Sequence, residues 1–375
     1  MQRIKKKLFF SIPILLILFS WSKGGTVFGC YETALAFKNT CNGAPYYAED
    51  WNTFVTRDVT CNQMQICPVG STGTAPNCTW KRKLCVTCSQ QDGQLFMRIQ
   101  SNGLPDHCVP GKVALQERVI DVKFRFDPPP VTFFQKPSNV DALNHMICDF
   151  DSSSESNLPS DSMFRNYGEK TISIINMVGI AANGVPMYNG NSPRNTDYFY
   201  PKDWAGSNQK NVDQDIDACL GAIQPEDGVY HYWFLPPCLY HADKIQTSKY
   251  CDNVTDCFTD MASYSKKIYT DFSNTWTLIG MAKDGHKIIG PYTAGNSEFD
   301  CQALDICNGI RDSSSGNYTY VAVTTFPYVV GCYGPGAYVT FNSVCSKNVC
   351  SFGSSLFNNL ILFGLLAILM LHSFY

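Results

Sequence analysis

The chain has 375 residues, with 29 Lys and Arg against 32 Asp and Glu, a net charge of −3. This length suggests about two domains. No basic patch stands out beyond the first residues, so the composition argues against a nucleic-acid-binding protein.

Residues 1–22 are predicted to be a secretory signal peptide that precedes the folded chain. Arg3 and three lysines come before an uncharged apolar run, residues 8–21, which is too short to span a bilayer. Small residues allow cleavage after Ser22 or, alternatively, after Gly29. A lipoprotein-type cleavage before Cys30 is a further alternative.

All 18 cysteines follow this signal, and an even number in a secreted chain predicts a framework of disulfides. Residues 30–92 contain seven of them among Gly, Pro and Asn turns, which predicts a small disulfide-rich module. Because seven is odd, at least one must pair outside the module, and Cys108 is the candidate. Three glycosylation sequons agree with secretion; they begin at Asn77, Asn253 and Asn317.

From residue 93 onward, short alternating or β-branched stretches are separated by Gly, Asn and Asp turns. The predicted strands lie at 94–100, 119–126, 171–182, 228–235, 275–282, 318–326 and 336–341. No window shows a long amphipathic helix. Residues 93–345 are therefore predicted to form a mainly β domain, an antiparallel sandwich or barrel-like fold. The alternative is an α+β fold, with helices at 138–151 or 256–269.

The C-terminal segment, residues 351–375, contains an uncharged stretch at 360–371 that is short for a membrane span and has no Lys or Arg after it. Small residues just upstream favour a signal for a glycosylphosphatidylinositol (GPI) anchor. The attachment residue could be as early as Ser346 or Ser351. The alternative is a single C-terminal membrane helix. In either case we expect an extracellular protein that is attached to the membrane at the cell surface.

A sixteen-residue motif occurs twice, at 217–232 and at 305–320. Without a gap, six residue pairs match: Asp217 with Asp305, Cys219 with Cys307, Gly221 with Gly309, Gly228 with Gly316, Tyr230 with Tyr318, and Tyr232 with Tyr320. The period of 88 residues (305 − 217) is too long for a solenoid repeat. The motif therefore predicts an internal duplication, and each aspartate is expected to cap a turn through its carboxylate.

The order of these motifs resembles the YHYH domain family, which is named for its Tyr-His-Tyr-His signature. The resemblance covers about residues 95–340 and is carried by Asn102–His107, Asp217-Ala218-Cys219-Leu220-Gly221, Tyr230-His231-Tyr232, Asp284-Gly285, Asp305-Ile306-Cys307-Asn308-Gly309 and Phe326-Pro327-Tyr328. The second histidine of the signature is Trp233 in this chain. The resemblance implies a secreted or surface domain and does not imply a particular reaction.

A divalent metal site is the alternative interpretation of the histidines. It would use His107 and His231 with Asp106, because imidazole and carboxylate groups suit zinc or a related ion. In a strand, however, His231 points away from Tyr230 and Tyr232, so the three side chains cannot line one pocket. The structural interpretation is that the tyrosines pack in the core and His231 bonds a turn. Asp284-Gly285 is likewise expected to form a hairpin turn.

The sequence therefore predicts a non-enzymatic binding or coat component of the cell surface with a protein or glycan ligand. Aromatic residues at 198–204 are candidates for contacting that ligand. The alternative function is a metal-dependent hydrolytic domain that uses His107 and His231. No nucleophile elbow, phosphate loop or dinucleotide motif is present in the sequence.

Overall fold

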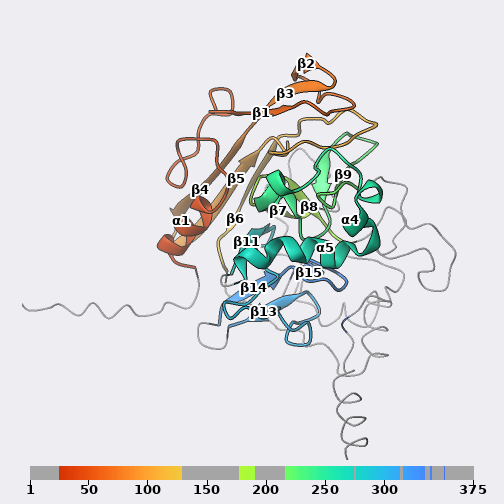
Figure 1. Ribbon diagram of the computed structural model, residues 1–375. Coiled ribbons are helices and arrows are strands. Elements are labelled where there is room, and N and C mark those ends of the chain that lie inside the picture. Colours follow the sequence, from red (N-terminus) through yellow and green to blue (C-terminus); the bar gives the residue numbers. More distant parts are fainter. Residues whose placement is uncertain are drawn as a thin grey trace, which may run out of the picture.

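The computed structural model describes residues 25–128, 177–190, 216–273, 276–312, 316–333, 338–339 and 350. These residues form mostly short strands, arranged in two three-stranded sheets, one eight-stranded sheet and a two-stranded ribbon (Figure 1). The predicted mainly β class is confirmed. None of the helices in the described part of the chain has the length and apolar character needed to cross a membrane. Residues 138–151, where one alternative helix was expected, lie outside the described residues.

The N-terminal part forms one helix and two small sheets. Its elements are α1 (Val27–Leu35), β1 (Arg57–Cys61), β2 (Thr72–Thr74), β3 (Asn77–Arg82), β4 (Leu84–Gln91), β5 (Gln94–Ser101) and β6 (Ile120–Arg125). Helix α1 begins where the Thr26 hydroxyl accepts a hydrogen bond from the Gly29 N–H at 2.9 Å, an N-cap. In β6, Ile120, Val122 and Phe124 are buried at alternate positions, as the period of a strand requires.

The predicted division between residues 92 and 93 falls within a continuous sheet. Strands β4 and β5 are antiparallel, with Leu84 opposite Ser101 at one end and Gln91 opposite Gln94 at the other. The turn between them lies at Asp92-Gly93. Strand β6 then pairs with β5. The disulfide-rich segment and the domain after it therefore share the sheet β4-β5-β6, and the domain boundary itself stays a prediction.

The central sheet has the order β13-β14-β12-β11-β7-β8-β10-β9. Its strands are β7 (Met177–Ala181), β8 (Pro186–Tyr188), β9 (Gly221–Ile223), β10 (Tyr230–Tyr232), β11 (Leu278–Ala282), β12 (Lys287–Ile289), β13 (Gly309–Arg311) and β14 (Tyr318–Val321). The remaining ribbon pairs β15 (Cys332–Tyr333) with β16 (Tyr338–Val339). Two of the neighbouring pairs, β8–β10 and β12–β14, are parallel, so this sheet is mixed and not wholly antiparallel.

The order of the central sheet is a palindrome of two equivalent halves. One half is β7-β8-β10-β9 and the other is β11-β12-β14-β13. In each half the first two strands form an antiparallel hairpin, the second and third strands are parallel, and the third and fourth are antiparallel. The halves meet where β7 and β11 run antiparallel, with Ile180 opposite Met281. On either side of this pair, Gly179 lies opposite Ala282 and Gly280 opposite Ala181, so the register is symmetric. The predicted internal duplication thus extends from one motif to half of a sheet.

The junction of the halves depends on glycine. A Cβ atom at Gly280 would lie 2.2 Å from the Ile180 carbonyl oxygen, and one at Gly179 would lie 2.6 Å from that of Met281. Both contacts are with backbone atoms, which cannot rotate away. The two strands can approach this closely only because each half carries glycine at the same position.

Helices lie mainly between residues 238 and 272, and they include the second alternative helical region, 256–269. They are α3 (Cys238–His241), η4 (Ala242–Lys244), η5 (Cys251–Asn253), α4 (Thr255–Thr259), α5 (Met261–Ile268) and η6 (Tyr269–Phe272). Figure 1 shows α5 running across the central sheet. The helices are anchored to this region by buried side chains, since the Ser265 hydroxyl bonds the Leu235 carbonyl at 2.5 Å and the Tyr269 hydroxyl bonds the Pro236 carbonyl at 2.7 Å.

Eight disulfides join the described cysteines. They are Cys30–Cys88, Cys41–Cys85, Cys61–Cys108, Cys67–Cys78, Cys219–Cys238, Cys251–Cys257, Cys301–Cys350 and Cys307–Cys332. The prediction that the odd cysteine of the N-terminal module pairs with Cys108 is confirmed, and the partner is Cys61. Such a framework constrains the unfolded chain and stabilises the folded one.

Candidate functional site

Each repeated motif is closed by its aspartate. Asp217 Oδ1 accepts hydrogen bonds from the Cys219 N–H at 2.8 Å and the Gly221 N–H at 2.9 Å, and Oδ2 accepts one from the Tyr230 hydroxyl at 2.7 Å. Burial raises the pKa of Asp217 to about 7, against the lowering effect of these bonds. Burial likewise raises the pKa of Tyr230 well above its ordinary value. The phenol therefore remains a donor.

The second copy repeats this arrangement bond for bond. Asp305 Oδ1 accepts from the Cys307 N–H at 2.9 Å and the Gly309 N–H at 2.7 Å, and Oδ2 accepts from the Tyr318 hydroxyl at 2.8 Å. All of these groups are buried in both copies. The predicted role of the aspartates as turn caps matches this geometry.

In the first half, Tyr232 is the centre of a buried polar cluster. Its hydroxyl lies 2.7 Å from His107 Nε2 and accepts a hydrogen bond from Asn183 Nδ2 at 3.1 Å. His107 Nδ1 lies 2.9 Å from the Cys108 carbonyl, which can only accept, so Nδ1 carries the ring hydrogen and Nε2 accepts from Tyr232. Burial lowers the pKa of His107 even beside Asp106, which keeps the ring neutral.

Asp106 connects this cluster to the surface. Its Oδ1 accepts from Asn183 Nδ2 at 2.8 Å, and its Oδ2 pairs with Lys38 Nζ at 2.7 Å. Burial alone would raise the pKa of Asp106, but the positive charges of Lys38 and Arg82 outweigh it and hold the pKa below its ordinary value. Asp106 is therefore an ionised and fully paired carboxylate.

The second half builds an equivalent cluster from other parts of the chain. The Tyr320 hydroxyl donates to Asp284 Oδ2 at 2.6 Å, where Asp284 occupies the hairpin-turn position that Asn183 has in the first half. His286 packs edge-on against Tyr318 and Tyr320, as the ring of His107 lies beside Tyr230 and Tyr232. Asp284-Gly285 forms the turn between β11 and β12, which is the predicted hairpin.

His286 lies beside two carboxylates, Asp284 and Asp127, whereas His107 lies beside one, Asp106. His286 Nδ1 lies 3.6 Å from Asp127 Oδ1. Burial alone would lower the pKa of His286, but Asp284 and Asp127 outweigh it and raise the pKa. Burial raises the pKa of Asp284. The two halves thus share one geometry but differ in electrostatics.

The sheet β4-β5-β6 supplies the outer wall of both clusters. At the end of β5, the Ser101 hydroxyl donates to the Gly184 carbonyl at 2.7 Å, in the turn of the first hairpin. Just after β6, the Asp127 N–H donates to the Gly285 carbonyl at 2.9 Å, in the turn of the second hairpin, β11–β12. The same sheet therefore brings His107 to one half and Asp127 to the other.

The two histidines of the predicted metal site lie on opposite faces of β10. His231 points away from Tyr230 and Tyr232; it stacks on Tyr188 at a centroid distance of 3.9 Å and lies edge-on to Trp233 at 4.2 Å. Its Nδ1 bonds the Val229 carbonyl at 3.2 Å, and burial lowers its pKa to about 3. The structure therefore brings His107 to Asp106, Tyr230 and Tyr232, and brings His231 to other aromatic residues.

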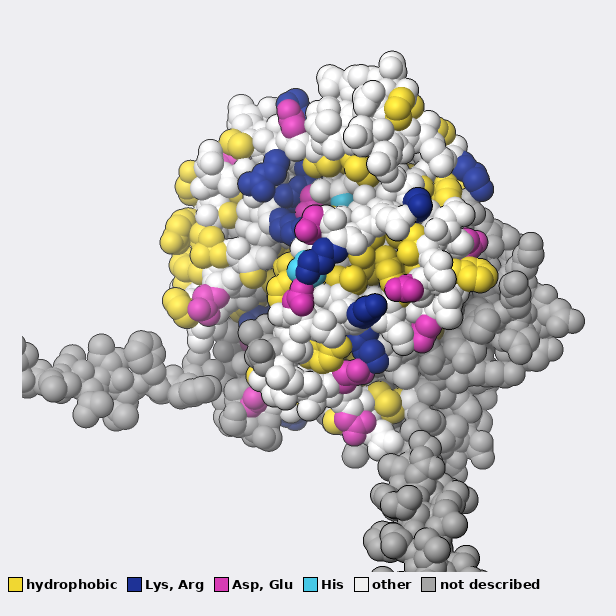
Figure 2. Space-filling model, in the orientation of Figure 1, with side chains coloured by type: hydrophobic (Ala, Val, Ile, Leu, Met, Phe, Trp, Pro, Cys, Tyr) yellow, Lys and Arg dark blue, Asp and Glu magenta, His cyan; other side chains and the backbone are white. Residues whose placement is uncertain are grey.

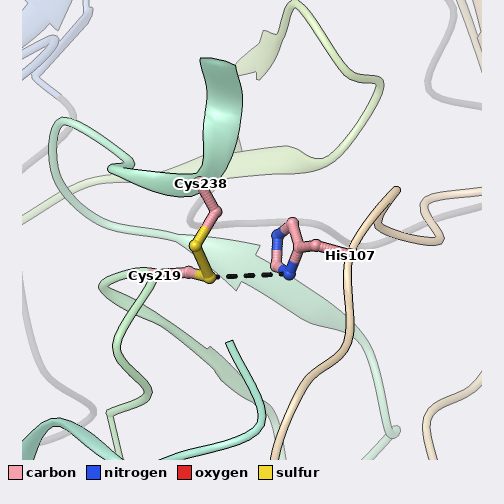
Figure 3. Close-up of side chains that lie close together, drawn as sticks. All are labelled: His107, Cys219 and Cys238. Atoms are coloured by element: carbon pink, nitrogen blue, oxygen red, sulfur yellow. Dashed lines mark hydrogen bonds between the residues drawn. A yellow bond between two sulfur atoms is a disulfide. The ribbon is translucent and has the colours of Figure 1, made fainter. Parts of the chain in front are cut away.

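Among the described residues, one group of three possible metal ligands has its ligand atoms within 4.8 Å of one another: His107, Cys219 and Cys238. Figure 3 shows that Cys219 and Cys238 form a disulfide, and that His107 Nδ1 contacts Cys219 Sγ at 3.5 Å. A metal-binding cysteine must be a thiolate, so this group does not suit a metal as it stands. The metal site at His107, His231 and Asp106 stays a prediction.

Residues 157–302 match the family model described as YHYH protein. Within this segment the chain is similar to the YHYH family. No curated protein matches the chain, and no solved structure matches it either. The match overlaps the segment in which the resemblance was seen and includes the Tyr230-His231-Tyr232 signature of the YHYH domain.

Sequence reasoning missed several members of the clusters around the YHYH signature. They are Lys38, Arg82, Asp127, Asn183, Cys238, His286 and Cys332. One signal was available for Asn183, because Gly179-Ile180-Ala181-Ala182-Asn183-Gly184 and Gly280-Met281-Ala282-Lys283-Asp284-Gly285 share a pattern at a spacing of 101 (280 − 179). The others are brought in by long-range packing.

The glycosylation sequons of the secretion hypothesis are placed differently in the fold. Asn77 is exposed at the start of β3, and Asn253 is exposed at the end of η5. Asn317 is half-buried, and its carbonyl accepts from the Asp312 N–H at 2.9 Å. Glycosylation at all three stays a prediction. The aromatic residues at 198–204 lie outside the described residues.

Proposed function

We propose that this protein is a secreted, membrane-anchored binding protein of the cell surface without an enzymatic role, and that its N-terminal module carries the binding surface. One observation carries this proposal. The signature tyrosines, Tyr230 and Tyr232, are buried and form hydrogen bonds inside the protein. By contrast, Phe28, Tyr46 and Tyr47 on the N-terminal module are 70%, 66% and 60% exposed. Leu35 and Val27 are also exposed and lie on α1. We call these five residues the aromatic patch.

The aromatic patch faces outward from the edge of the molecule. Figure 2 shows hydrophobic side chains gathered at the left edge, where Figure 1 has α1. Exposed large apolar side chains that gather on one face of a protein often mark a binding surface. Aromatic side chains in particular supply much of the binding energy at protein interfaces.

The loop that carries Tyr46 and Tyr47 is held rigidly. Glu49 Oε1 accepts from the Asn42 N–H at 2.7 Å and the Gly43 N–H at 2.8 Å, and the Cys88 N–H bonds the Pro45 carbonyl at 2.8 Å. The disulfides Cys41–Cys85 and Cys30–Cys88 fix the loop and α1 to β4. A surface that is rigid before binding loses less conformational entropy when a partner arrives.

The extracellular, anchored part of the proposal is supported by chemistry and by sequence. Eight disulfides persist in an oxidising compartment. The basic and apolar segment at the N-terminus and the small residues before the apolar C-terminal tail are typical of a signal peptide and a GPI signal. We propose a protein partner, because the residues of the aromatic patch are large aromatic and aliphatic side chains, and aromatic side chains are enriched where protein interfaces bind most strongly.

The test is binding of the secreted, fluorescently labelled protein, assembled into tetramers, to intact cells by flow cytometry. The paired change Tyr46→Ser and Tyr47→Ser should weaken binding by about tenfold or more. Phe258→Ser, at a 64% exposed residue on α4, is the matched control and should leave binding unchanged.

Treatment of the cells distinguishes the classes of partner. Binding to a protein should be lost after trypsin treatment and retained after periodate oxidation of glycans. It should also persist in a metal chelator. Binding that is unchanged by the patch substitutions, or that requires a metal ion, would overturn the proposal.

A further inference from the structure

We propose that the mature chain begins at Lys23 and that the lipid anchor is attached at Ser351, so that the disulfides Cys30–Cys88 and Cys301–Cys350 both lie inside it. This inference rests on the proposed function, because it presupposes secretion and anchoring. The sequence alone leaves cleavage after Ser22 or Gly29 open, and it leaves attachment at Ser346 or Ser351 open. The fold discriminates between these alternatives.

The backbone is already part of the fold at Gly25. Its N–H donates to the Asp127 carbonyl at 3.2 Å. A Cβ atom there would lie 2.7 Å from Phe126 Cδ1 and 2.8 Å from the Phe126 carbonyl oxygen, so the chain is packed closely against the end of β6. A mature chain that lacked Gly25 would lose this contact.

The first turn of α1 also argues against cleavage after Gly29. Thr26 caps the helix through the Gly29 N–H, and its carbonyl accepts from the Cys30 N–H at 2.9 Å. The Thr33 hydroxyl in turn bonds the Gly29 carbonyl at 2.7 Å. Cleavage after Gly29 would remove the cap and the first turn, and the four leading N–H groups of the shortened helix would lose their partners.

Cys30 is the strongest constraint on the N-terminus. It is fully buried and forms the disulfide with Cys88. Cleavage before it would place a charged α-amino group directly beside this buried disulfide, which is unfavourable. A lipoprotein-type modification would need the Cys30 thiol for a thioether, and that sulfur is already bonded. Hydrolysis of the Ser22–Lys23 peptide bond, with water as co-reactant, leaves the whole helix and its cap intact.

The C-terminus is constrained in the same way by Cys350. It is 2% exposed and is bonded to Cys301, with the Cα atoms 5.8 Å apart. Attachment at Ser346 would release residues 347–375, including Cys350, and leave Cys301 without its partner. Attachment at Ser351 keeps the disulfide. Residues 352–359 then separate the attachment residue from the apolar tail, and they include the small residues Gly353, Ser354 and Ser355 that such signals favour upstream of the tail.

The proposed step at Ser351 is a transamidation. The amine of an ethanolamine-bearing glycolipid attacks the Ser351 carbonyl carbon. A new amide bond forms there, and the Ser351–Phe352 peptide bond breaks. The leaving segment, residues 352–375, departs with a free α-amino group, so no oxidant or reductant is required.

The test is mass spectrometry of the full chain after expression in a eukaryotic secretory cell and release from the membrane by a phosphatidylinositol-specific phospholipase C. We expect an N-terminus at Lys23 and a tryptic peptide of residues 348–351 that carries an ethanolamine phosphate remnant on Ser351 and is disulfide-linked to Cys301. A mature N-terminus at Cys30, or a remnant on Ser346, would overturn the inference and leave secretion standing. A chain that keeps residues 1–22 and 352–375 and stays inside the cell would overturn both.

Two matched substitutions provide an independent readout. Ser351→Gln should lower the amount of phospholipase-releasable protein at the cell surface by about tenfold, because the attachment residue must be small. Ser346→Gln should leave that amount unchanged. The reverse pattern would contradict attachment at Ser351.

Discussion

The hydroxyl group of Tyr230 donates a hydrogen bond to Oδ2 of Asp217 at 2.7 Å, with both side chains buried. Since Oδ1 of the same carboxylate is satisfied by two backbone N–H groups, both oxygens of the buried acid are paired. The repeat of this arrangement at Tyr318 and Asp305 shows that the motif closes a turn and fixes a strand. The first tyrosine of the YHYH signature is therefore an architectural residue.

Removal of this hydroxyl should destabilise both halves similarly. Tyr230→Phe and Tyr318→Phe each leave a buried carboxylate oxygen without its donor, so we expect each to lower the free energy of unfolding by about 1–3 kcal/mol. Denaturant titration followed by circular dichroism measures this. Tyr46→Phe, at an exposed tyrosine, is the control. Equal stabilities for wild type and Tyr230→Phe would contradict the architectural role.

The pKa of Asp217 predicts a pH dependence of stability. Burial raises it to about 7, compared with about 3.9 in an unfolded chain. A raised pKa means that the folded state holds the proton more tightly, so this contribution to stability is complete below about pH 4 and is lost as the pH rises through 7. The unfolding free energy of wild type minus that of Asp217→Asn should therefore fall over this range. Ionisable groups that both proteins share, such as His231, contribute equally to the two unfolding free energies, so their contributions cancel in the difference. A flat difference from pH 4 to 8 would refute the assignment.

The pairing of β7 with β11 should not tolerate a methyl group. Gly280→Ala and Gly179→Ala each place Cβ against a backbone carbonyl, and such overpacking costs about 1–3 kcal/mol. Gly295→Ala is the matched control, because the nearest atom to its Cβ is a side-chain oxygen 3.8 Å away. Thermal unfolding of the three variants compares them directly. A Gly280→Ala protein as stable as Gly295→Ala would mean that the halves are not in such close contact.

Metal content decides between the architectural and metal-binding interpretations of the histidines. His107 is bonded to Tyr232 on one face of β10, and His231 stacks on Tyr188 on the other. We therefore expect the untagged secreted protein to contain no stoichiometric metal, and a chelator to leave its unfolding midpoint unchanged. Elemental analysis of wild type, His107→Ala and His231→Ala provides the measurement. Stoichiometric metal that disappears in both variants would establish the metal site instead.

Much of the fold followed from local patterns in the sequence. The alternation at residues 94–100 and 119–126 predicted β5 and β6, and the Asp-x-Cys-x-Gly motif predicted a carboxylate-capped turn twice. These features depend on neighbours within a few residues, since a strand has a period of two and a turn is closed by its own side chains. The opposite orientation of His231 and its neighbouring tyrosines followed from the same period.

By itself the sequence determined the mainly β class, the duplicated motif, the presence of a disulfide framework and Cys108 as the candidate partner for a cysteine of the N-terminal module. The structure gave the pairings, including Cys61 with Cys108. Only the tertiary structure decided that β8 and β10 are parallel, that the halves meet at Ile180 and Met281, and that His107 and His286 reach equivalent places from unrelated segments. The physical reason is that these contacts join residues far apart in the chain. Their geometry is set by how whole strands pack, and no local spacing encodes it.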